Sequence, residues 1–212
     1  MPSSRTAPAC PQSVGASAAT VLLELLASVP DPRRPRGIRH GLPGILAVAI
    51  TAVVAGARSF AAIGQWVADA DADLLAALGS RHGCGPSESA IRRAFARLDA
   101  AELDAVLAGW LWTRTRVVDQ RRVIAIDGKT VRGARSRDRA APHLVAAFDH
   151  GSGAVLGQLA VTAKSNEIPA VRTLLAGFDL EGVVVTVDAM HNQTDTAKLI
   201  VEAGGDYVFT VK

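Results

Sequence analysis

Two apolar segments that each end in an aspartate decide the fold: Val123–Asp127 reads VIAID and Val183–Asp188 reads VVVTVD. Both are rich in β-branched residues, which favour strands, and their almost continuous apolar character is typical of buried strands in a sheet. Open α/β sheets bind their ligands at the carboxyl ends of such strands. If the two strands are neighbours, Asp127 and Asp188 lie side by side at that edge.

Further strand and helix signals surround these two segments. Runs of β-branched and apolar residues predict additional strands at 144–148, 154–162 and 207–211, and capped periodic runs predict helices at 167–176 and 194–203. The resulting order is β-β-β-α-β-α-β. Three strands in a meander followed by two right-handed crossovers give a mixed sheet in which the first and fourth strands can be neighbours.

The chain before residue 113 carries helix signals only. Apolar runs and capping residues predict helices at 21–28, 42–55, 60–69, 72–78, 87–98 and 99–112. Pro30–Arg36 (PDPRRPR) is a basic loop, because proline removes backbone donors and disfavours the α conformation before it. Leu42–Ala57 is shorter than the ~20 residues of a membrane span, so a buried helix and no membrane partner are expected.

The predicted fold class is therefore α+β, with an all-helical N-terminal domain followed by a mixed β-sheet with flanking helices. We divide the chain into a disordered tail (1–20), the helical domain (21–112), a basic linker (113–122) and the sheet domain (123–212). The 212 residues, 49% of them hydrophobic, exclude intrinsic disorder of the whole. Two distant cysteines speak against a disulfide scaffold or a four-ligand zinc site, and the tail does not resemble a signal peptide, so a cytoplasmic location is expected.

Charge is distributed unevenly along the chain. Residues 113–139 carry nine Lys/Arg against three Asp/Glu, whereas residues 140–212 carry four against eight. Such a basic segment suits a phosphate backbone, because each neutralised phosphate releases a counterion; a solvated linker is the alternative on charge alone. Arg132, Arg135 and Arg137 flank the first strand and are candidate DNA contacts. Arg93 and Arg97 share one face of the helix predicted at 87–98 and are candidates for reading DNA.

An aspartate at the end of a strand commonly caps a helix or forms a turn. Two adjacent carboxylates repel one another unless a cation lies between them, so the pair favours a hard divalent metal such as Mg²⁺ or Mn²⁺. The tripeptide Gly128-Lys129-Thr130 resembles the end of a phosphate-binding loop, but Val123 stands where that loop needs glycine. An aspartyl-phosphate nucleophile at Asp127 is the enzymatic alternative.

Five segments together resemble the catalytic region of DDE insertion-sequence transposases, in the H-repeat-associated or ISAs-type branch. The upstream stretch, from LLELLASVPDPRRPRG through PSESAIRRAFARLD, resembles the helical domain that accompanies this region. The five segments are VIAIDGKTVRGAR (123–135), HLVAAFD (143–149), KSNEIPA (164–170), VVVTVDAMHNQ (183–193) and GGDYVFTVK (204–212).

The resemblance implies an RNase H-like core in which Asp127 and Asp188 are the first two metal-binding acids of the DDE triad. It implies Mg²⁺ or Mn²⁺ as cofactor and DNA, at the ends of an insertion element, as the partner that is cleaved and joined. Lys129 and Lys164 fall on motif positions and are candidate backbone contacts. The resemblance leaves a homo-oligomer open and implies an association with the bacterial nucleoid when DNA is bound.

Family members continue past the position of Lys212 to the third acid. We therefore expect an incomplete RNase H-like sheet and a truncated copy that is inactive alone. The alternative function is a non-catalytic DNA-binding or interfering module derived from a transposase. Asp195 and Glu202 are the acids within the chain that could substitute for the third one, although a surface charge on the predicted helix explains each more simply.

Overall fold

The computed structural model describes residues 16–36, 38–114, 121–134, 141–161, 167–188 and 193–210, except for the side chains of residues 16, 17, 82 and 132. The chain divides into two compact units, Met1–Asp99 and Ala100–Lys212. We call them the helical unit and the sheet unit and describe each by itself.

The helical unit is built around one buried helix, α2. Its faces pack against α1, α3 and α5, and most of its residues are buried. Gly44 permits a close approach inside this core, because a Cβ at that position would lie 2.9 Å from the carbonyl oxygen of Gly79. No described helix is long and apolar enough to cross a membrane. The helices are α1 (Ala16–Leu26), α2 (Leu42–Val54), α3 (Phe60–Asp69), α4 (Ala72–Ala77), the 3-10 turn η1 (Arg81–Gly83) and α5 (Glu88–Phe95).

The predicted helices of this unit are present, with shifts at their ends. The side chains of Ser59 and Ser87 accept backbone hydrogen bonds at the starts of α3 and α5, as capping residues do. Helix α1 begins at Ala16, inside the segment predicted as a tail, because its Ala-rich first turn favours helix. Helix α5 ends at Phe95, before the predicted end at residue 98, because the amides of Arg97 and Leu98 both bond back to Ala94.

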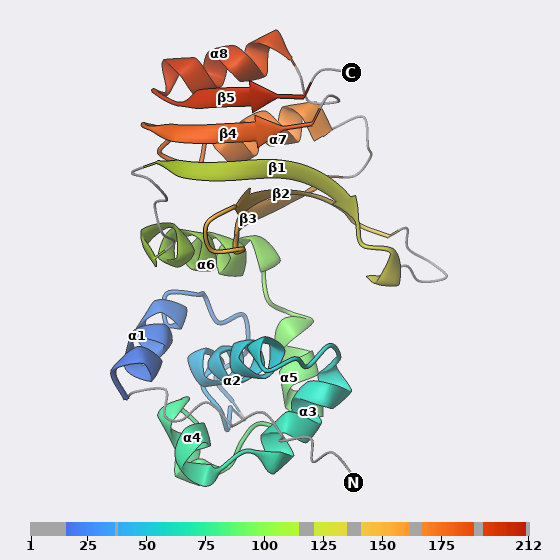
Figure 1. The fold of residues 1–212 in the computed structure, drawn as a ribbon. Coiled ribbons are helices and arrows are strands. Elements are labelled where there is room, and N and C mark those ends of the chain that lie inside the picture. Colours follow the sequence, from blue (N-terminus) through green and yellow to red (C-terminus); the bar gives the residue numbers. More distant parts are fainter. Residues whose placement is uncertain are drawn as a thin grey trace, which may run out of the picture. The chain divides into compact units, whose positions relative to one another are not determined.

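The sheet unit contains five strands in the order β3-β2-β1-β4-β5 (Figure 1). The pairs β1–β2 and β2–β3 are antiparallel, whereas β1–β4 and β4–β5 are parallel. The predicted mixed sheet and the predicted adjacency of the first and fourth strands are therefore confirmed, and the arrangement is RNase H-like. The strands are β1 (Arg122–Thr130), β2 (His143–Asp149), β3 (Val155–Val161), β4 (Val183–Val187) and β5 (Asp206–Phe209).

Strand β1 is longer than predicted. The sequence predicts a strand that stops at Asp127, but β1 continues to Thr130, which pairs with His143 of β2. The pairing with β4 stops earlier, at the pair Ile126–Val187. Because Asp127 and the three residues after it pair with β2, Asp127 is not the end of its strand. It marks the point at which the pairing of β1 with β4 ends, while its pairing with β2 continues to Thr130.

One hydrophobic core joins the sheet to its helices. Helix α7 (Glu167–Leu175) packs against β2 and β3, α8 (Thr194–Glu202) against β5, and α6 (Ala100–Arg114) against β3 (Figure 1). Ile124, Val145, Leu156 and Val185 are fully buried in this core. Because successive side chains of a strand point to opposite faces, this burial defines one helix-covered face and one opposite face.

Helix α6 belongs to the sheet unit by its contacts. The ring of Trp112 stacks on Phe178 with 4.9 Å between centroids, and the guanidinium of Arg122 lies 4.0 Å from the centre of the Trp112 ring. Arg122 also donates a 2.7 Å hydrogen bond to the carbonyl of Trp112. The compact units therefore divide between residues 99 and 100, whereas the sequence places the end of the helical domain at residue 112.

Replacing Trp112 with alanine should lower the free energy of unfolding by about 3 kcal/mol, because it removes the stacked ring and the surface on which Arg122 rests. Chemical denaturation measures the change. Thr113→Ala is the control, since Thr113 is an exposed neighbour on the same helix. Equal stability of the two variants would contradict the role assigned to Trp112.

Candidate functional site

The two strand aspartates meet through the parallel register of β1 and β4. Ile126 pairs with Val187; the next residue in β1 is Asp127, and the residue directly after β4 is Asp188. The side chains of Ile126 and Val187 are buried on the helix-covered face, so strand alternation directs both aspartates to the opposite face. Both aspartates are exposed. The structure thus brings together the two carboxylates that the sequence singled out.

The chemistry of this pair fits a hard divalent cation. Carboxylate oxygens are the ligands that Mg²⁺ and Mn²⁺ prefer, and Mg²⁺ usually takes only one or two of them together with water or phosphate oxygens. Within the described residues, no group of three or more His, Cys, Asp or Glu side chains could hold a metal ion. Asp127 and Asp188 are therefore two neighbouring carboxylates that belong to no larger metal-binding group of described residues.

The sheet face that carries the aspartates is only partly covered in the described structure. Val184 and Thr186, which alternate with the buried valines of β4, are half-buried, and Phe148 on β2 is 39% exposed. Val208 on β5 is 59% exposed. The aspartates consequently lie at the border of an accessible surface, where a large substrate can approach them.

A buried acid–base pair lies on the other side of β1. Glu167, the first residue of α7, is 2% exposed, and its Oε1 is 2.6 Å from Nε2 of His143. The second ring nitrogen of His143 is 2.8 Å from the hydroxyl of Thr130. A Cβ at Gly128 would lie 2.8 Å from Oε2 of Glu167. A side chain at position 128 would therefore require the buried carboxyl group of Glu167 to move.

The sequence alone does not predict this pair. Its local signals assign Glu167 to the start of a helix and His143 to a strand edge, and the two residues are far apart in the chain. The resemblance to the transposase motif KSNEIPA is the one signal that marked Glu167, without a role. Because Glu167 lies against Gly128 on the helix-covered face, it is separated by the strand from the carboxylate of Asp127.

The predicted basic contacts have different outcomes. Lys129 is exposed on β1, two residues after Asp127 and on the same side of the strand. Arg132 belongs to the 3-10 turn η2 (Arg132–Ala134), but its side chain is not among the described parts of the structure. Arg135, Arg137 and Lys164 lie outside the described residues.

Two arginines of the basic segment have structural partners. Arg121 forms an ion pair with Asp206, and Arg122 packs on Trp112. Part of the basic segment therefore holds the sheet unit together.

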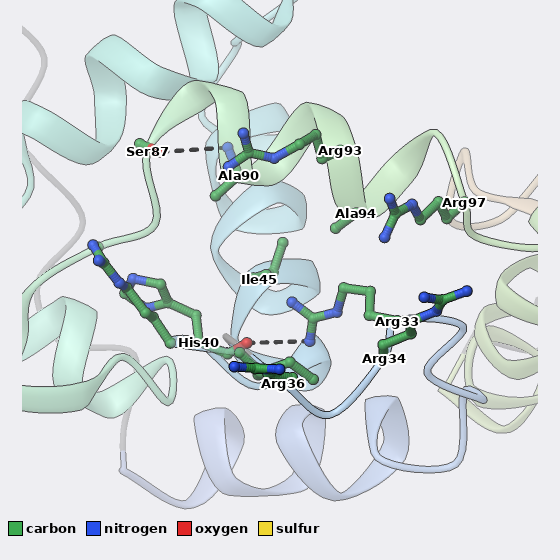
Figure 2. Close-up of a pocket in the computed structure, with 13 residues that line it drawn as sticks. Arg33, Arg34, Arg36, His40, Ile45, Ser87, Ala90, Arg93, Ala94 and Arg97 are labelled. Atoms are coloured by element: carbon green, nitrogen blue, oxygen red, sulfur yellow. Dashed lines mark hydrogen bonds between the residues drawn. The ribbon is translucent and has the colours of Figure 1, made fainter.

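The two arginines predicted on the helix at 87–98 belong to the helical unit, whereas the aspartates belong to the sheet unit. Arg93 and Arg97 line a pocket formed by α5 and the loop that carries Arg33, Arg34 and Arg36 (Figure 2). Their neighbour Arg92 is not part of this pocket. It forms an ion pair with Glu88 and lies 5.0 Å from the centre of the Phe60 ring.

Comparison with known proteins adds family information to this geometry. Residues 23–111 match the family model DDE_Tnp_1-associated, and residues 119–212 match the model Transposase DDE domain. The chain is 34% identical to the H repeat-associated putative transposase YbfD of Escherichia coli K12, covering 90% of this chain and 76% of YbfD. It is 33% identical to the putative transposase YncI of the same strain, covering 90% of this chain and 77% of YncI.

Other matches are longer proteins. The chain is 36% identical to the putative protein YbfL of E. coli K12 and spans about half of it, with 90% of this chain and 50% of YbfL covered. Among solved structures, the piggyBac transposase synaptic complex with hairpin DNA matches with a TM-score of 0.45 and 12% identity, covering 90% of this chain and 50% of that one.

Gly128→Ala should destabilise the sheet unit by about 1–3 kcal/mol, because the added Cβ would lie 2.8 Å from the buried carboxyl group of Glu167 and one of the two must move. Thermal denaturation should show a midpoint several degrees below that of the unchanged chain. Gly133→Ala is the control, since a Cβ at Gly133 meets nothing within 4 Å. If both variants melt together, the buried pair does not constrain β1.

Proposed function

This chain belongs to the DDE transposase family, in its H repeat-associated branch, and on that premise we propose that the sheet unit carries two acids of a metal-dependent centre for cleaving and joining DNA. The observation that carries the proposal is the register of β1 and β4, which brings Asp127 and Asp188 together on one exposed edge. Two carboxylates on adjacent strands repel one another, and a divalent cation between them would offset that repulsion.

In this proposal Asp127 and Asp188 hold Mg²⁺ or Mn²⁺. When bound, such an ion supplies positive charge to a phosphodiester and lowers the pKa of an attacking hydroxyl or water. The chain's own contribution is positioning. The hydrogen-bonded pairing of β1 with β4 fixes the spacing of the two carboxylates. The buried Glu167–His143 pair packs against β1 on the helix-covered face.

DNA is the proposed substrate, because transposases act on DNA. Lys129, exposed on the same side of β1 as Asp127, is suited to neutralise a phosphate close to the metal. We also assign Arg132, Arg135, Arg137 and Lys164 to the DNA backbone, because the basic segment and the family motifs contain them. Such contacts orient the DNA without reading its bases.

Two sets of backbone pairing hold Asp127 in place. A strand that carries a metal ligand must be held rigidly, since a small displacement of a reacting group lowers catalytic rates strongly. Here β1 pairs with β4 from Arg122 to Ile126 and with β2 from Ile124 to Thr130. Asp127 thus lies within the segment paired with β2 and directly follows the last residue paired with β4.

Asp127→Asn and Asp188→Asn should each weaken Mn²⁺ binding at least tenfold, because each removes one of two charged ligands. Isothermal titration of the chain with Mn²⁺ measures this change in affinity. Asp73→Asn, at an exposed aspartate of α4 in the helical unit, is the control and should bind as the unchanged chain does. Equal binding by all three variants would overturn the metal assignment.

Metal-dependent nicking of a DNA duplex gives a second measurement. If the chain or a longer relative nicks DNA, replacing the aspartate at the position of Asp127 or of Asp188 with asparagine should abolish that nicking. The Asp73→Asn control should keep it. DNA binding that needs neither aspartate, together with no metal binding, would favour the non-catalytic DNA-binding module instead.

A further inference from the structure

The helical unit contains a pocket lined by six arginines. Two come from the region of α5 and four from the loop that precedes α2. The volume of the pocket is about 590 Å³. Figure 2 shows Arg93 and Arg97 facing the segment of Arg33, Arg34 and Arg36 across the pocket, with Ile45 of α2 behind them. The arginines are Arg33, Arg34, Arg36, Arg39, Arg93 and Arg97.

Five of these arginines are exposed, and one is held in place. Arg33 forms an ion pair of 2.7 Å with Asp31 and donates a 3.1 Å hydrogen bond to the carbonyl of His40, which fixes the loop. No ion pair with a described residue involves the other five, and no described acidic side chain lines the pocket. Like charges gathered around a concave surface repel one another, so the arrangement is suited to an anion.

The electrostatic surroundings of His40 agree with this geometry. Burial, together with the positive charges of Arg33, Arg39 and Arg81, lowers the pKa of the His40 ring below its usual value. An additional positive charge is therefore unfavourable at His40, which lines the pocket, whereas a negative charge is favoured there.

We propose that this pocket binds the phosphodiester backbone of DNA, as an anchoring site separate from the acids of the sheet unit. Guanidinium groups match phosphate oxygens with two parallel hydrogen bonds, and their charge is independent of pH in the physiological range. This inference rests on the proposed function for the choice of DNA as the anion. It adds a named binding site and a mode of binding to that proposal.

The distribution of the arginines favours a long anion over a small one. Among the described basic side chains that line the pocket, Arg33 and His40 are half-buried, whereas the other five are exposed. An enclosed small anion is held by buried donors, whereas a backbone that crosses the rim meets several exposed guanidinium groups in succession. The same geometry assigns Arg93 and Arg97 to phosphates, because they face the loop across the pocket (Figure 2). Base reading in the major groove needs side chains that extend from the surface.

The test compares two double variants of the full chain that remove the same charge. Arg93→Ala with Arg97→Ala empties one wall of the pocket. Arg58→Ala with Arg92→Ala is the control, because both arginines are exposed in the helical unit and neither lines the pocket. The probe is a fluorescent 20-base-pair duplex of arbitrary sequence, titrated at several salt concentrations in EDTA so that the metal site does not contribute.

The pocket variant should bind the duplex at least tenfold more weakly at 100 mM salt. The slope of its log affinity against log salt concentration should become shallower by about 0.9 for each phosphate that the missing arginines no longer neutralise. The control should bind less than threefold more weakly than the unchanged chain and keep its slope. Equally weakened binding in the two variants would overturn the proposal.

Thermal denaturation without DNA separates a binding role from a structural one. The pocket variant should have an unchanged or raised melting midpoint, because removing two of the clustered arginines relieves repulsion among like charges. A structural role for Arg93 and Arg97 would instead lower the midpoint. A lowered midpoint accompanied by weaker duplex binding would therefore contradict the assignment of these arginines to phosphates.

Inorganic pyrophosphate and ATP distinguish a small anion from the DNA backbone. If either displaces the duplex only at millimolar concentrations, the backbone assignment stands. Micromolar binding of pyrophosphate that disappears in the pocket variant, with duplex binding unchanged, would overturn it. Asp127→Asn with Asp188→Asn should leave binding in EDTA unchanged. If the metal assignment is wrong, only the metal-binding measurements will contradict it. If the pocket assignment is wrong, only DNA binding in EDTA will contradict it.

Discussion

The parallel pairing of β1 with β4 is the constraint on which the candidate site depends. Parallel strands need a crossover connection, and here that crossover contains β2, β3 and α7, so the whole middle of the sheet unit lies between the two aspartates in sequence. A shift of the register by one residue would turn one aspartate toward the helix-covered core. The burial of Ile126 and Val187 in the hydrophobic core prevents this shift. Core packing thereby determines the face of the sheet on which the two aspartates lie.

The two faces of β1 have different roles near its carboxyl end. On one face the exposed Asp127 is available to a ligand, and on the other the buried Glu167–His143 pair fills the space that Gly128 leaves open. A buried carboxyl group is costly unless it has a polar partner, and Nε2 of His143 lies 2.6 Å from Oε1 of Glu167. The pair therefore couples the start of α7 and the start of β2 to the position of the first candidate ligand.

The sequence predicts this architecture well because its signals are local and consistent. Alternating or continuous β-branched runs marked each strand, and serine caps marked α3 and α5. The continuation of β1 to Thr130 could not be read in the same way, since Gly128, Lys129 and Thr130 resemble a loop and become a strand only by pairing with β2. The Glu167–His143 contact and the convergence of Arg33 with Arg93 are tertiary events between distant segments. Composition and periodicity carry no signal for such contacts.

Paramagnetic broadening by Mn²⁺ in an NMR spectrum of the isotopically labelled chain tests the central claim most directly, since it reports which backbone amides surround the bound ion. The account predicts that amides around Asp127 and those around Asp188 broaden together at the same low Mn²⁺ concentration, and that Asp127→Asn removes the effect at both strands. Broadening confined to one strand, or an effect at β4 that survives Asp127→Asn, would contradict a shared site built by the β1–β4 register.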